Sequence, residues 1–144
     1  MRAQIPRPAL LLGLAGLLPF LCCVMTGFFE VPAFVQGWED LIMLRYGIVI
    51  LSFMSGVLWG FATKARGRVA VMGYGLSVIP ALWAFFTTMG PTPQALAALM
   101  AGFVGLLGLD WVFWRLGLAP EWWMRLRLIL TSGVMASLAF GLYL

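Results

Sequence analysis

Residues 45–61 read RYGIVILSFMSGVLWGF, a stretch in which only the first residue carries a charge. A helix needs about 20 mostly apolar residues to cross the hydrocarbon core of a bilayer, and the neighbours of this stretch are apolar too. The whole chain has the same character: 63% of its 144 residues are hydrophobic, 10% are charged, and the mean hydropathy is +1.03. A soluble domain of this length needs far more polar residues to cover its surface. The sequence therefore predicts an integral membrane protein.

Four further runs have comparable length and apolar character. The five predicted spans cover roughly residues 9–29, 41–62, 69–89, 93–114 and 125–143. Strand-type alternation is absent, so we expect a single all-α domain over residues 1–144, a bundle of five transmembrane helices. No A-x-A cleavage motif follows the first run, which is therefore expected to be retained as a span. The alternative is that one run is re-entrant or lies on the surface, and the first run, interrupted by Pro19, is the candidate.

The basic residues indicate an orientation, because cytoplasmic loops of membrane proteins are enriched in Lys and Arg. With the N-terminus in the cytoplasm, the inner segments contain Arg2, Arg7, Lys64, Arg66, Arg68, Arg115, Arg125 and Arg127. The outer loops contain Glu30, Glu39 and Asp40 and no basic residue. The sequence predicts a multi-pass protein of a bacterial inner membrane with a periplasmic C-terminus. Its net charge of +4 reflects this topology, and no nucleic-acid partner is expected.

The sequence lacks the residues and motifs that common metal sites and enzyme active sites use. The chain has no histidine, which is the commonest general base and a frequent ligand of zinc and haem. Cys22 and Cys23 are adjacent, so they lack the spacing of a metal site and the geometry of an ordinary disulfide. No Gly-rich phosphate loop or nucleophile elbow occurs. We expect a protein that is not an enzyme and that has no metal and no cofactor.

Two ionisable residues lie within predicted spans, where a charge is costly and each is a candidate for function. Arg45 lies near the outer end of the second span and Asp110 near the inner end of the fourth, so the two cannot pair with each other. For Arg45 the predicted partner is Glu30, in a structural ion pair, with Glu39 and Asp40 as alternatives.

For Asp110 the candidate partners are Arg125, Arg127 and the basic loop TKARGR (63–68). We favour Arg127, because it shares a face of the fifth span with Gly141. Both pairs could simply hold helices together. A sharper hypothesis is an inner-face ligand pocket, whose predicted residues are Asp110, Trp59, Trp111, Trp114 and Arg127. Five tryptophans, these three together with Trp122 and Trp123, fall near the inner face, and an aromatic belt at the lipid headgroups is their ordinary explanation.

Small residues at helical spacing predict close helix packing, since small side chains let backbones approach in lipid. In the second span Ser52, Gly56 and Gly60 lie within about 60° of Arg45 on a helical wheel, and this stripe is predicted to face protein. The fifth span has a similar ladder, Gly133, Ser137 and Gly141, and the fourth has one made of Ala97, Ala101, Gly105 and Gly108. The ladders could pack within the chain or against a partner. Pro19 and Pro80 are expected to kink the first and third spans.

Two stretches carry a resemblance, YGIVILSFMSGVLWGFA (46–62) and APEWWMRLRLILT (119–131). They resemble the family that includes mitochondrial transmembrane protein 69 and many proteobacterial inner-membrane proteins. The order of five spans also fits this family over most of the chain. The resemblance implies a membrane location and a fold, and no reaction.

Two functional readings follow. The first is a non-catalytic accessory or assembly subunit that packs against a larger membrane complex, or against a second copy of itself, through a small-residue face. The second is a protein that binds or transports a lipid or other small molecule, using the inner-face pocket around Asp110. In both readings the lipid bilayer surrounds the protein.

Overall fold

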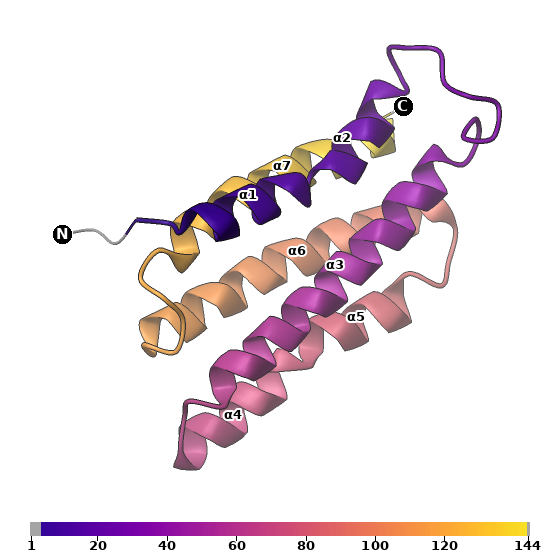
Figure 1. Cartoon of the computed structure of the whole chain (residues 1–144). Coiled ribbons are helices and arrows are strands. Elements are labelled where there is room, and N and C mark those ends of the chain that lie inside the picture. Colours follow the sequence, from indigo (N-terminus) through magenta and orange to yellow (C-terminus); the bar gives the residue numbers. More distant parts are fainter. Residues whose placement is uncertain (1–3, 144) are drawn as a thin grey trace.

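The computed structural model describes residues 4–143, and every regular element among them is a helix (Figure 1). The helices are α1 (Arg7–Ala15), α2 (Leu18–Met25), α3 (Glu39–Ala62), α4 (Gly67–Ser77), α5 (Ile79–Thr87), α6 (Thr92–Arg115) and α7 (Trp123–Tyr143). Arg2, one of the basic residues used to predict the orientation, lies outside the described residues.

Within residues 4–143, five helical segments are long and apolar enough to cross a membrane, which agrees with the predicted number of spans. They are Arg7–Met25, Glu39–Ala62, Gly67–Thr87, Thr92–Arg115 and Trp123–Tyr143. The first span ends at Met25, earlier than the predicted residue 29, because the chain continues through turns and irregular loop to residue 38. The other boundaries agree with the prediction to within two residues.

Two of the spans are interrupted, at the places where proline was expected to kink them. The first span breaks between α1 and α2, and the third breaks at Val78 between α4 and α5. Pro19 and Pro80 lie in the first turn of α2 and α5. Proline has no N–H to donate and its ring collides with the preceding turn, so both predicted kinks are confirmed.

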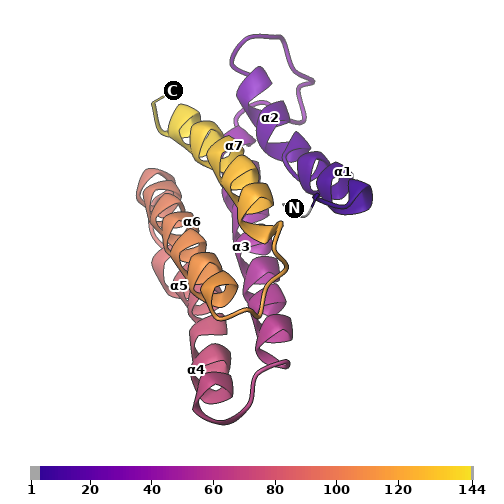
Figure 2. The ribbon, with the colours of Figure 1, turned by 90° about the vertical axis from the view of Figure 1, so that its left-hand side faces the viewer.

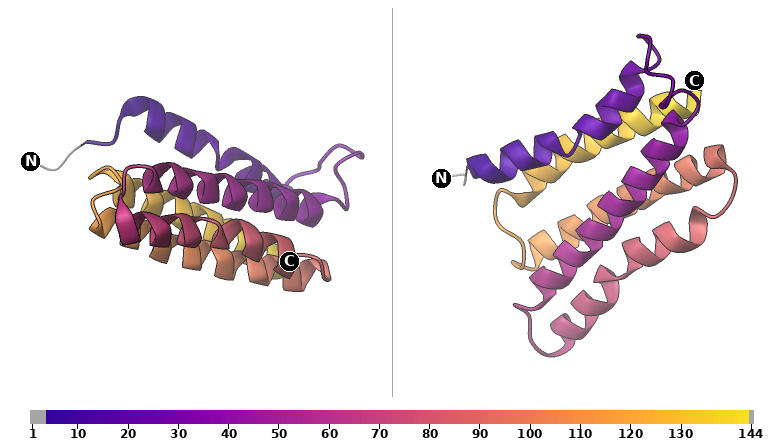
Figure 3. Two further views of the ribbon diagram at one scale, coloured as in Figure 1. Left: turned by 90° about the horizontal axis from the view of Figure 1, so that it is seen from below. Right: turned by 45° about the vertical axis from the view of Figure 1, so that its right-hand side comes forward.

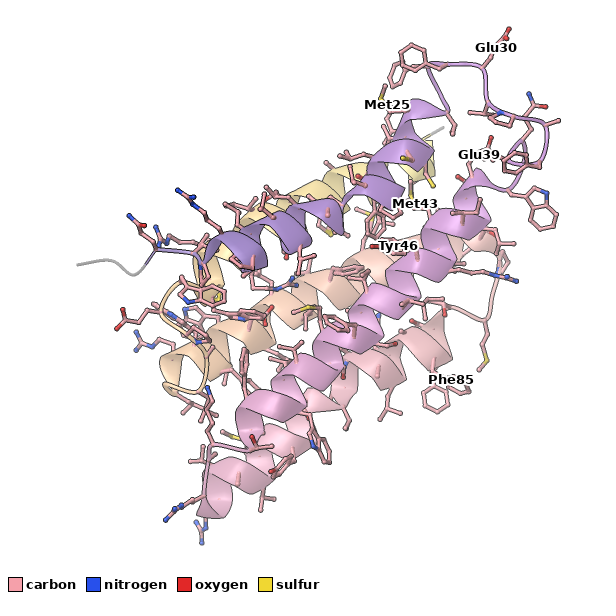
Figure 4. The ribbon with its side chains drawn as sticks, in the orientation of Figure 1. Met25, Glu30, Glu39, Met43, Tyr46 and Phe85 are labelled. Atoms are coloured by element: carbon pink, nitrogen blue, oxygen red, sulfur yellow. The ribbon has the colours of Figure 1, made fainter. Side chains whose placement is uncertain are left out.

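Helix α3 contributes a hydroxyl group to each of these breaks. Tyr46 donates a hydrogen bond of 2.8 Å to the carbonyl oxygen of Gly16, and Figure 4 shows its side chain directed at the first span. Ser55 donates to the carbonyl oxygen of Ser77, and its own oxygen accepts from the N–H of Ala81 at 3.4 Å. Backbone polar groups in lipid must find partners inside the protein. Helix α3 thus helps to satisfy the backbone at both interruptions.

The bundle has a well-packed part and a looser margin. Helix α3 packs against α4, α5 and α6, and α6 packs against α7. The core lies among these helices, with Leu51, Leu58, Leu99 and Phe103 fully or almost fully buried. The first span is the least buried of the five and lies at the edge of the bundle (Figures 2 and 3). Its α1 half packs on α7, whereas its α2 half packs on both α3 and α7.

Candidate functional site: a buried ion pair beside a cavity

Asp110 and Arg127 form a buried ion pair between α6 and α7. Arg127 Nε lies 2.9 Å from Asp110 Oδ2, and both side chains are almost completely excluded from the surface. Trp123 Nε1 donates a second hydrogen bond of 2.9 Å to Asp110 Oδ1. Both carboxylate oxygens therefore accept, as an ionised carboxylate does. The structure confirms the predicted pairing of Asp110 with Arg127.

The row of polar side chains on α7 follows from helical spacing. Trp123, Arg127 and Thr131 are each four residues apart, so they lie one above another on a single face of the helix. All three are buried. The turn after α6 brings this face opposite Asp110, and it uses Gly117 at a φ of 75°, a left-handed conformation that favours glycine. Sequence and turn geometry together thus position the pair.

A cavity of about 470 Å³ adjoins this row of side chains. It lies between the first span, α3 and α7, and its wall includes Leu12, Gly16, Phe53, Val57, Phe61, Trp122, Trp123, Arg127, Thr131 and Val134. Leu12 and Phe53 are exposed on the outside of the bundle, so the cavity borders the lipid-facing surface. Its size falls within the range of ligand pockets, roughly 300–1,000 Å³.

The cavity is mostly apolar, and two of the residues that line it each have a buried side-chain atom without a hydrogen-bond partner. Arg127 Nη2 and Thr131 Oγ1 are the buried side-chain atoms left unpaired among residues 4–143. Both residues line the cavity, and they are only 4% and 5% exposed. An unpaired buried polar group is costly and rare in native proteins. These two atoms are therefore donors that the protein itself leaves unsatisfied beside the cavity, although neither has appreciable surface open to it as the side chains stand.

The three tryptophans predicted to surround Asp110 do not line this cavity. Trp59, Trp111 and Trp114 are 49%, 51% and 37% exposed, and none of them lines the cavity. Their positions on the outer faces of α3 and α6 suit indole rings that meet the lipid headgroups. Trp122 and Trp123 line the cavity in their place.

The predicted ion pair of Arg45 with Glu30 does not form. Both side chains are exposed, and Glu30 lies in the loop after α2, at the edge of the molecule (Figure 4). The prediction failed because it placed Arg45 inside the protein. An arginine near the end of a span can extend its side chain to the headgroups and needs no protein partner.

The small-residue ladder of α7 packs against the rest of the chain, and that of α3 does not. On α7, Gly133 and Gly141 meet neighbours as predicted: an added Cβ would lie 2.8 Å from Leu17 and 3.0 Å from Met43 Sδ, and Ser137 between them is buried. On α3 the Ser52 stripe does not pack within the chain, since Gly56 and Gly60 are exposed with nothing within 4 Å of an added Cβ, and contact with a partner stays a prediction.

The face of α3 that packs is the opposite one. A Cβ on Gly47 would collide with Leu99, and one on Gly102 of α6 would lie 2.8 Å from both Leu51 and Trp83. The α6 ladder of Ala97, Ala101, Gly105 and Gly108 is also exposed. Small residues permit close packing in lipid, but their spacing alone does not say which of two faces meets the rest of the chain.

The sequence prediction missed Thr131, and it placed Trp123 only among the inner-face tryptophans and not among the ligand residues. Trp123 and Thr131 share the spacing of Arg127, and this four-residue repeat on α7 is the signal that could have identified them. As for metals, no group of three or more Cys, Asp and Glu side chains within residues 4–143 is arranged to hold an ion.

Comparison with known proteins identifies relatives over nearly the whole chain. A family model described as "Protein of unknown function (DUF3429)" matches residues 5–143. The chain is 35% identical to transmembrane protein 69 of Xenopus tropicalis over 95% of its length and 28% identical to that of Mus musculus over 88%. The aligned regions cover 54% and 51% of these relatives, so the chain spans about half of their length. No solved structure gives a significant match.

Proposed function

Because the chain belongs to the family that includes transmembrane protein 69 (DUF3429), whose description assigns no activity, we propose from its own geometry that it binds an amphiphile. The cavity between the first span, α3 and α7 is the binding site. The protein is a multi-pass membrane protein. In this proposal it resides in a bacterial inner membrane with its N-terminus in the cytoplasm, and it has no catalytic activity.

One observation carries the proposal: Arg127 and Thr131, which line a mostly apolar cavity, each have a buried side-chain donor without a hydrogen-bond partner. A ligand already dissolved in lipid gains little from moving its hydrocarbon chain into an apolar cavity, since lipid tails are as apolar as the cavity wall. Affinity must then come from close packing and from hydrogen bonds. Arg127 and Thr131 supply donors for such bonds, and the wall supplies the packing surface.

The loose attachment of the first span supports the same reading. Helix α1 packs on α7 and its exposed face contacts no other helix closely. A ligand of the bilayer can therefore reach the cavity sideways, between α1 and α3, without passing through water. The basic residues around the inner ends of the spans, among them Arg66 and Arg68, favour entry from the cytoplasmic leaflet, whose anionic lipids they attract.

Filling the cavity is expected to remove the bound amphiphile. In a Val57→Trp variant the larger side chain projects from α3 into the cavity, whereas Val49→Trp adds the same side chain to the exposed face of α3. We expect the wild-type protein and Val49→Trp to retain a bound amphiphile in gentle detergent, and Val57→Trp to lose at least about nine-tenths of it, which requires the binding free energy to weaken by about 1.4 kcal/mol or more. Native mass spectrometry of the three purified proteins measures the occupancy.

Equal occupancy in Val57→Trp and the wild-type protein would contradict the proposal. A loss in both tryptophan variants would also count against it, because Val49 does not line the cavity.

A separate observation favours a second function, contact with another membrane protein. The exposed small-residue faces of α3 and α6 suit close contact with another transmembrane helix, as an accessory or assembly subunit of a larger complex, or a homo-oligomer, would need. Gentle-detergent native gels distinguish the two readings, since such a subunit comigrates with a large complex and a ligand-binding protein migrates alone or as a small oligomer.

A further inference from the structure

We propose that the ligand of this cavity is an uncharged amphiphile whose carbonyl oxygen accepts hydrogen bonds from Arg127 Nη2 and Thr131 Oγ1. This inference rests on the proposed function and specifies the chemistry of its ligand. It concerns the polar end of the ligand, because the apolar wall alone does not select one hydrocarbon chain over another.

The two donors are placed to act together. Arg127 and Thr131 are one helical turn apart on the same face of α7, and both line the cavity. Arg127 Nε already donates to Asp110, which fixes the position of the guanidinium. The unpaired Nη2 group has almost no open surface as the side chains stand, so a ligand group that displaces its neighbours can accept from it while the bond from Nε to Asp110 is kept. A threonine hydroxyl can donate or accept, so it adapts to an acceptor oxygen beside it.

Charge decides between a carbonyl and a carboxylate. Among the described residues that line the cavity, Arg127 is the only charged one, and the carboxylate of Asp110 already balances it at 2.9 Å. A ligand carboxylate would place a second negative charge beside a single guanidinium in a medium of low dielectric constant, where such repulsion is strong. A neutral carbonyl accepts the same hydrogen bonds without this cost.

Two kinds of membrane molecule carry such a group. One is a quinone, whose flat ring bears carbonyl oxygens and a long hydrocarbon tail. The other is an uncharged glycerolipid, which bears the carbonyl oxygens of its acyl esters. The aromatic side chains of Phe61, Trp122 and Trp123 line the cavity and contact one another through Trp123. Aromatic rings offer faces and edges against which either a planar ring or an acyl chain can pack.

The test compares three probes in the detergent-solubilised full chain: decylubiquinone, dioctanoylglycerol and decanoate. Dissociation constants are measured by titration with native mass spectrometry for the wild-type protein, Thr131→Val and Thr131→Ser. Valine keeps the shape of threonine without the hydroxyl, and serine keeps the hydroxyl. Val57→Trp serves as the blocked cavity, and Val49→Trp as its matched control.

We expect at least one neutral probe to bind more tightly than decanoate, and the probe that binds identifies the source of the carbonyl. Its dissociation constant should rise about threefold to tenfold in Thr131→Val, the effect of one neutral hydrogen bond, and stay within about twofold in Thr131→Ser. Tighter binding of decanoate than of both neutral probes overturns the inference, as does an unchanged affinity in Thr131→Val. If Val57→Trp binds all probes as the wild-type protein does, the proposed function itself fails.

Discussion

Replacement of Arg127 by methionine is expected to lower the free energy of unfolding by about 3–5 kcal/mol, because it leaves a buried carboxylate without its counter-ion. Asp110 is fully buried and would keep only its hydrogen bond from Trp123. Methionine has a similar length and no charge, so the loss reports mainly the missing guanidinium. The measurement is an equilibrium unfolding titration with SDS in mixed micelles.

The partner substitution completes a thermodynamic cycle. Asp110→Leu alone leaves the guanidinium buried without a counter-ion, and the double variant Asp110→Leu with Arg127→Met removes both charges. We expect the loss in free energy of unfolding of the double variant to be smaller than the sum of the two single losses. The difference should be well over 0.5 kcal/mol, since the effects of independent sites usually add to within about that amount. Arg115→Met, at an exposed position near the end of α6, should cost less than about 1 kcal/mol. Additive losses in the cycle would mean that the two charges do not interact.

The second large effect is expected at Gly47. A valine there would drive its side chain into Leu99, at the contact between α3 and α6, and overpacking of this kind typically costs about 1–3 kcal/mol. The same substitution at Gly56, on the exposed face of α3, meets no atom within 4 Å and should leave the free energy of unfolding nearly unchanged. The thermal stability of both variants in detergent measures the difference.

A larger loss of stability in Gly56→Val than in Gly47→Val would contradict the packing of α3 described above. If Gly56→Val were the destabilising variant, the Ser52 stripe would face the core of the bundle. If Gly56→Val changed the oligomeric state without changing the thermal stability of the single chain, the exposed face of α3 would instead be a contact with a partner.

Sequence alone predicted the features that depend on hydrophobicity and charge. Five spans follow from five long apolar runs, and the kinks follow from Pro19 and Pro80. The partner of Asp110 was also predictable, because Arg127 is a base at comparable depth and on the inward face of its helix. In each case the decisive quantity is local: the length of a run, the position of a proline, or the angle between residues on one helix.

The rest depends on contacts between helices that local patterns do not specify. Helix α3 has small residues on two faces, and only the collision of a side chain on Gly47 with Leu99 identifies the packed one. The tryptophans were misplaced because an indole ring suits both a pocket and a headgroup belt. The cavity arises because the first span packs closely at α2 and loosely at α1, which its uniformly apolar sequence does not indicate.

An experimental density map of the protein in lipid nanodiscs tests the central claim most directly. We predict elongated density in the cavity between the first span, α3 and α7, with its polar end within hydrogen-bond distance of Arg127 Nη2 and Thr131 Oγ1. A cavity closed by α1 packed against α3, or one in which both atoms are bonded to groups of the protein itself, would contradict the claim.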